Sequence, residues 1–160
     1  MFVFAITAAQ PASAYCEGWE KGGLSYYSVG NEYKRALFVA TVRVERETWL
    51  GLDGQPKLLK GPFQHGASRP WGFDDYMGAY YDIVTVERYK GRPPQKFRLF
   101  SENSTARFWL IPGKQFVVFV SRGRFEKPIN AALTVDNCGH TPLLRANAAG
   151  LVRTLNKLKT

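Results

Sequence analysis

The chain has 160 residues, which suits one domain, and with 45% hydrophobic and 14% aromatic residues it can build a core and need not be disordered. No apolar run beyond the N-terminal segment approaches the ~18 residues of a membrane-spanning helix. The formal net charge of +9 is concentrated in two acid-free segments, residues 88–98 and 143–160. These segments could face nucleic acid, an anionic surface or an acidic protein, although a solvated face that keeps the protein soluble is the simpler interpretation.

The N-terminal residues 1–14, MFVFAITAAQPASA, have the pattern of a secretory signal peptide. An apolar run is followed by small residues, with Ala12 and Ala14 in the arrangement that signal peptidase cleaves. The run is short and no basic residue precedes it, so we expect the signal to be truncated at its start. The alternative is an ordinary N-terminal strand. We therefore predict a signal peptide over 1–14, one domain over 15–160, and a secreted, periplasmic or otherwise extracytoplasmic location.

Five segments have the pattern of β-strands. Residues 36–48 alternate between apolar and polar, which is typical of a half-buried strand, and residues 79–90 and 95–102 are rich in β-branched and aromatic residues. Residues 114–122, KQFVVFVSR, are apolar on both faces, which indicates a barrel strand covered by a helix. Residues 130–137 predict a weaker fifth strand.

Helical periodicity follows near the end of the chain. Thr141 and Pro142 resemble a helix start, and an apolar stripe then recurs at helical spacing at Leu144, Ala148, Leu151, Leu155 and Leu158. A shorter helix is expected around Asn31–Arg35. Together these elements predict a mainly β fold, a five-stranded OB-like barrel with a C-terminal α-helix and a short N-terminal helix.

The connection over residues 49–75 is unusually long for a link between two strands, and such loops often carry binding sites. It holds four large aromatic residues, which we take as a candidate binding loop: Trp49, Phe63, Trp71 and Phe73. The alternative is that these rings fold back over the mouth of the barrel.

The sequence is poor in catalytic signatures. Its only histidines are His65 and His140, and none of the common hydrolase, phosphate-binding or zinc-binding motifs is present. Cys138 and His140 could form a dyad, but in an exported chain a disulfide between Cys16 and Cys138 is favoured. Adjacent Asp74 and Asp75 are too few to make a metal site. We expect no enzymatic activity, no catalytic or metal-binding residues and no cofactor.

Four segments in a fixed order resemble the netrin-like domain family, in particular short exported proteins similar to tissue inhibitors of metalloproteinases. They are ALFVATV, YDIVTVERYKG, IPGKQFVVFV and NCGHTPLL, the last followed by a leucine-striped helix. The resemblance covers most of residues 16–158. It implies an OB-type barrel, secretion, disulfides and no enzymatic activity.

The chain departs from the family pattern at its N-terminus. The family usually opens with two cysteines, C-x-C, each bridged to a later one, whereas here Ala14 stands where the first would fall. The resemblance thus implies that Cys16 and Cys138 form the family's second bridge. In the inhibitors, the N-terminal cysteine chelates the enzyme's zinc through its backbone. Cleavage after Ala14 would leave Tyr15 as the N-terminal contact, without the bridge that holds it, so zinc chelation is not expected to be the main role.

These observations predict an exported, non-catalytic binding module that binds an unidentified protein, with proteases among the candidates, through loop 49–75 or its basic face. One alternative is a metalloproteinase inhibitor that acts through its N-terminus. A second is an OB-fold that binds single-stranded nucleic acid, for which Tyr81, Phe97 and Arg98 would supply aromatic and basic groups. Export argues against nucleic acid as the partner.

Overall fold

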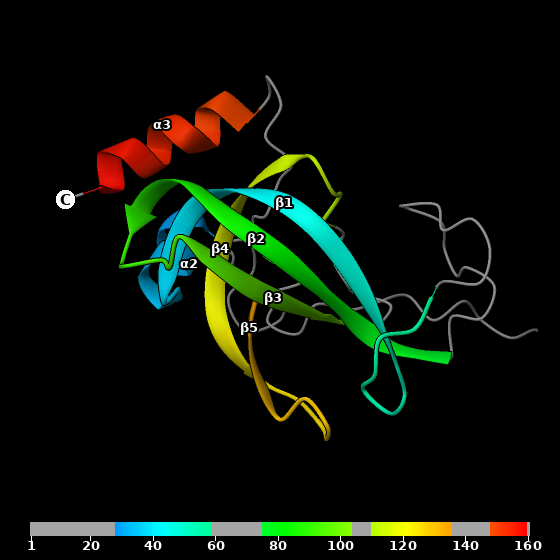
Figure 1. Ribbon diagram of the computed structural model, residues 1–160. Coiled ribbons are helices and arrows are strands. Elements are labelled where there is room, and N and C mark those ends of the chain that lie inside the picture. The colour runs from blue at the N-terminus through cyan, green and yellow to red at the C-terminus, as the bar shows by residue number, and fades with distance from the viewer. Residues whose placement is uncertain (1–27, 59–74, 104–109, 136–147, 160) are drawn as a thin grey trace, which may run out of the picture.

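The computed structural model describes residues 28–58, 75–103, 110–135 and 148–159. It confirms the predicted class, because five antiparallel strands form a nearly closed barrel with a helix at each end of the described chain (Figure 1). The elements are α2 (Val29–Arg35), β1 (Phe38–Gly51), β2 (Tyr76–Lys90), β3 (Lys96–Glu102), β4 (Gln115–Arg124), β5 (Ala131–Val135) and α3 (Ala149–Leu158). None of the helices in these ranges has the length and apolar character needed to cross a membrane.

The strands follow the order β3-β2-β1-β4-β5, and β3 and β5 lie against each other where the barrel closes. The long strand β1 makes this possible because it pairs with β2 along its whole length and with β4 over Phe38–Arg43. Its register with β2 shifts at four places, and such irregularities bend a strand and increase its twist. Strand order and curvature are consistent with an OB-type barrel.

The barrel interior is filled by alternate residues of the strands. Val42, Val44 and Ile83 are at most 1% exposed, and Leu99 and Phe116 close the same core. β4 is buried on both faces, as predicted. Phe116, Val118 and Val120 join the interior cluster, whereas Val117 and Phe119 belong to a second cluster that includes residues of both helices.

The two helices cover one part of the outer barrel surface. α2 begins where Ser28 Oγ accepts a hydrogen bond from the Asn31 backbone N at 3.3 Å, which confirms the expected short helix. α3 contributes Leu155, which is fully buried, to a cluster with Val39 and Val117. The predicted helix start at Thr141 and Pro142 lies outside the described residues.

A lysine of β2 fastens α2 to the barrel. The Lys90 ammonium donates to three carbonyl oxygens at the end of α2, those of Tyr33 at 2.6 Å, Lys34 at 2.8 Å and Ala36 at 2.7 Å. A cation suits this position because the last carbonyls of a helix have no partner within the helix and carry the negative end of its dipole. The Tyr33 hydroxyl lies 2.8 Å from the Tyr89 carbonyl and 3.1 Å from the Leu158 carbonyl, so it connects α2, β2 and α3.

Candidate functional site

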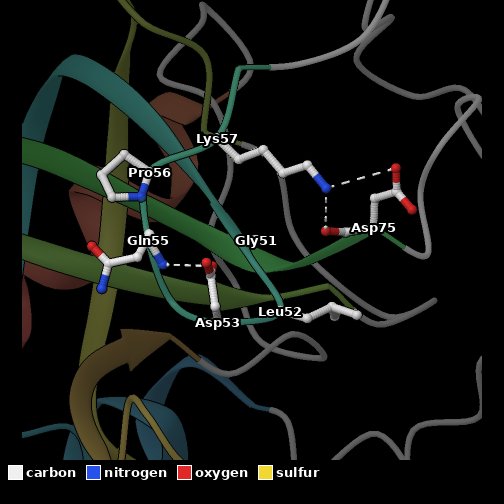
Figure 2. A pocket seen from close by; sticks show the side chains of 7 residues that line it. All are labelled: Gly51, Leu52, Asp53, Gln55, Pro56, Lys57 and Asp75. Atoms are coloured by element: carbon white, nitrogen blue, oxygen red, sulfur yellow. Dashed lines mark hydrogen bonds and ion pairs between the residues drawn. The ribbon is translucent and has the colours of Figure 1, made fainter.

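The end of β1 and the residues that follow it form a hollow of about 380 Å³ (Figure 2). It is lined by Gly51, Leu52, Asp53, Gln55, Pro56, Lys57 and Asp75. The chain turns sharply here, because Gly51 N donates to Gln55 O and Gly54 N to Gly51 O, both at 2.9 Å. Gly54 has a φ of 76°, a conformation that favours glycine, and a Cβ at this position would collide with the Pro128 ring. The β1–β2 connection therefore meets the β4–β5 connection at this end of the barrel.

Polar contacts hold the walls of the hollow. The Asp53 carboxylate accepts from the Gln55 backbone N at 3.0 Å. The Lys57 ammonium lies 3.7 Å from the Asp75 carboxylate and donates to the Asp75 carbonyl at 3.4 Å, as Figure 2 shows. The same ammonium lies 5.2 Å from the centre of the Tyr76 ring, and the Tyr76 hydroxyl donates to Leu58 O at 2.8 Å. These contacts position the described residues that line the hollow.

Two leucines stand on the surface beside this hollow. Leu52 is 67% exposed and Leu58 is 92% exposed, the two largest values among the exposed large hydrophobic residues of the described chain. These side chains contribute little to the stability of the fold, because little of their apolar surface is removed from water. Single exposed leucines are common on protein surfaces, so it is their position next to the hollow that makes this end of the barrel a candidate binding surface.

The structure places one of the four predicted loop aromatics. Trp49 lies in β1, is 5% exposed and packs edge-on against Tyr76 with ring centres 5.6 Å apart, so its ring belongs to the core. Phe63, Trp71 and Phe73 lie outside the described residues. They fall in the stretch that joins Leu58 to Asp75, the two ends of which border the hollow.

Three further predicted residues, in the ranges 1–27 and 136–147, also lie outside the described residues. They are the predicted N-terminal contact Tyr15 and the two cysteines, Cys16 and Cys138, so the disulfide stays a prediction. Of the adjacent acids, only Asp75 is described, and it pairs with Lys57. Within the described ranges, no group of three or more histidine, cysteine, aspartate or glutamate side chains could hold a metal ion.

The residues expected to support nucleic-acid binding lie on opposite faces of the sheet. Tyr81 is 1% exposed and cannot stack on a base, and Phe97 is partly buried against the interior cluster. Only Arg98 lies on the outer face, where its guanidinium covers the Tyr80 ring at 4.2 Å from the ring centre. Tyr81 and Phe97 therefore do not form, with Arg98, the exposed aromatic and basic face that the nucleic-acid alternative requires.

The basic segments also serve several different purposes. Lys90 is part of the helix attachment, whereas Lys96 and Arg98 project from β3. Arg153, Lys157 and Lys159 lie at α3, and Lys159 pairs with Glu87 of β2 at 3.6 Å. The predicted basic face is therefore divided between a structural cation and separate surface groups.

Two ionisable groups near the helices have shifted pKa values. Burial raises the pKa of the Tyr89 phenol; a hydrogen bond with Thr41 opposes this rise, and Glu87 adds to it. Burial lowers the pKa of the Lys90 ammonium. Both groups bind backbone or neighbouring side chains of the fold, which assigns them a structural role.

No protein-family model matches the chain, and no curated protein matches it either. The functional residues are therefore argued from the geometry alone. Sequence reasoning missed Leu52 and Leu58, because isolated leucines in a loop have no periodicity that would distinguish surface from core. It also missed the arrangement of Arg46, Asp82 and Arg98 described below, which depends on the pairing register of three strands.

Proposed function

We propose that this chain is an exported, non-catalytic binding module of the netrin-like type, and that it binds another protein through the end of the barrel formed by residues 51–58. The observation that carries the proposal is the exposure of Leu52 and Leu58 at the hollow that follows β1. Apolar groups at the centre of an interface supply binding energy when a partner removes them from water. Residues 51–58 belong to the described part of the predicted binding loop 49–75.

The test uses the exported mature chain immobilised as wild type and as the double variant Leu52→Asp with Leu58→Asp. Proteins retained from the host's extracytoplasmic fraction are identified, purified and measured individually against both forms. We expect the double variant to lose most of the affinity for a true partner, because each substitution introduces a charge that the interface would have to desolvate. Leu37→Asp is the matched control, since Leu37 is 48% exposed but lies between α2 and β1. Equal binding by the double variant would contradict the proposal.

The same preparation tests export and the alternative role. Intact mass before and after reduction and alkylation should show a chain that begins at Tyr15 and gains alkyl groups at Cys16 and Cys138 only after reduction. An uncleaved chain with two freely alkylated thiols would contradict export and the disulfide. The inhibitor alternative depends on the N-terminal segment, and sub-micromolar inhibition of a zinc protease that is lost when residues preceding Cys16 are altered would favour it over the proposed module.

A further inference from the structure

The outer surface of β1, β2 and β3 carries two rows of side chains that the strand register brings together. One row consists of Arg43, Val84 and Lys96, and the next of Arg46, Asp82 and Arg98. We call these six residues the outer sheet patch. It lies away from the hollow at residues 51–58, on strands whose opposite face forms the barrel core.

A single carboxylate organises the second row. Arg46 directs both its Nε and a terminal nitrogen to Asp82 Oδ2, each at 2.7 Å, and Arg98 Nε lies 3.2 Å from Asp82 Oδ1. The central guanidinium carbon of Arg98 also lies over the Tyr80 ring, 4.2 Å from its centre. Both arginine side chains remain largely exposed, at 74% and 53%. Asp82 thus contacts two guanidinium groups that remain accessible to solvent.

The charge of this surface is positive even after its internal pairs are counted. Arg43, Arg46, Lys96 and Arg98 are opposed by Asp82 and by Glu45, which lies 3.6 Å from Arg43. One carboxylate cannot neutralise two guanidinium groups, so an incoming anion would meet an excess of positive charge and guanidinium donors that can form charge-assisted hydrogen bonds.

Apolar side chains accompany these cations. Val84 is partly buried between Arg43 and Lys96 in the first row, and Val86, further along β2, is 51% exposed. A surface that recognised only a uniform polyanion would gain nothing from valines at these places. An apolar centre with charged groups around it is the usual composition of a protein-binding surface, in which arginine is enriched.

We propose that the outer sheet patch binds an acidic segment of a polypeptide, whose carboxylates pair with Arg46 and Arg98 and whose apolar side chain packs on Val84. The way in which Asp82 binds both arginines shows the carboxylate geometry that this surface accepts. Single-stranded nucleic acid fits less well, because the Tyr80 ring already contacts Arg98 and the Phe100 ring, whose centre is 5.3 Å away, which leaves less of it for stacking on a base. This site goes beyond the proposed function, since it requires no contact with residues 51–58.

The experiment measures binding of three labelled probes to the exported chain by fluorescence anisotropy at low and physiological ionic strength. The first probe is a peptide of alternating glutamate and leucine, the second replaces each leucine with serine at the same charge, and the third is heparin. We expect the glutamate–leucine peptide to bind more tightly than the glutamate–serine peptide and to weaken as salt increases. The double variant Arg46→Gln with Arg98→Gln should lower its affinity roughly tenfold, as the loss of two charge pairs implies.

Two control variants separate this site from other causes. Arg122→Gln with Arg124→Gln removes the same charge from exposed positions of β4 and should leave affinity within about twofold, because these arginines lie outside the outer sheet patch. General charge attraction alone would instead lower the affinity equally in both double variants. Leu52→Asp with Leu58→Asp should also retain peptide binding, so failure of one site is distinguishable from failure of the other. Equal losses in both arginine pairs would overturn the proposal, as would tighter binding of heparin than of the glutamate–leucine peptide.

Discussion

The outer surface of β1 and β2 has two halves with opposite character. Around Val39 and Tyr89 it is apolar and lies beneath the helices, whereas around Arg46 and Asp82 it is charged and open. The same two strands therefore form a core on one half and a solvent-facing surface on the other. The difference shows that the alternation of a strand determines which side chains share a face, while the neighbouring elements determine whether that face is buried.

The largest expected effect comes from opening the covered half. Leu155→Ala removes a side chain that is fully buried beneath α3, and we expect the free energy of unfolding to fall by about 3 kcal/mol, because a large-to-small core substitution loses burial and leaves a cavity. Urea denaturation measures the change. Asn156→Ala, at the exposed next position, is the control and should change stability by less than about 0.5 kcal/mol. A loss of that small size in Leu155→Ala would mean that α3 contributes little to the fold.

Removing the Lys90 ammonium tests how the covered half is fastened. Lys90→Met keeps an unbranched side chain but leaves the carbonyls of Tyr33, Lys34 and Ala36 without this donor. We expect a loss of about 1–2 kcal/mol, since these oxygens regain only part of their hydrogen bonding from water. Lys96→Met, an exposed position of β3, provides the control for loss of charge. Equal unfolding free energies of the two variants would contradict the role of Lys90.

The Tyr89 phenol, in the half of the surface that the helices cover, should make the free energy of unfolding depend on pH. Because its pKa is raised in the folded protein above the ordinary 10.0, the neutral phenol is favoured by folding. That contribution is fully present below pH 10.0 and is lost as pH rises toward the folded-state pKa, since the unfolded chain ionises first. Tyr89→Phe should therefore be less stable at neutral pH by about 1 kcal/mol, for loss of the contact with Thr41, and the difference should shrink above pH 10.0.

Urea denaturation of both proteins across this pH range measures that difference. The lowered pKa of Lys90 changes the unfolding free energy in the opposite direction: the unfolded chain holds this proton more tightly, so stability rises with pH. Both proteins carry Lys90, so this contribution cancels in the difference between them. A stability difference that stayed constant across pH 10.0 would contradict the assigned burial of the phenol.

The smallest effect on stability is expected in the open half. Arg46→Gln with Arg98→Gln breaks exposed ion pairs with Asp82, and such pairs contribute little, so unfolding free energy should fall by less than about 1 kcal/mol. Thermal and urea unfolding measure it on the same preparation that is used for the peptide probes. A loss as large as that of Leu155→Ala would show that these arginines serve the fold and would remove the argument for a binding surface.

Much of the fold could be predicted from the sequence, because each of its strands carries a local pattern. The both-sides-buried character of residues 114–122 predicted a barrel strand covered by a helix, and this is confirmed by Val118 inside and Val117 outside. The candidate site was harder to predict, because it depends on relationships between strands. Trp49 was assigned to the loop, although β1 extends to Gly51 and buries the ring, since no local pattern marks where a long curved strand ends.

The attachment of α3 has a consequence for the order in which the protein is completed. All five described strands are synthesised before α3, so Val39, Val117 and Phe119 have only α2 and its end packed against them until α3 has emerged. A helix of ten residues has little stability of its own, so it forms on this surface and not ahead of it. A chain halted before residue 149 would present these apolar residues to chaperones and to other nascent chains, which makes the arrival of α3 the step that ends its exposure to aggregation.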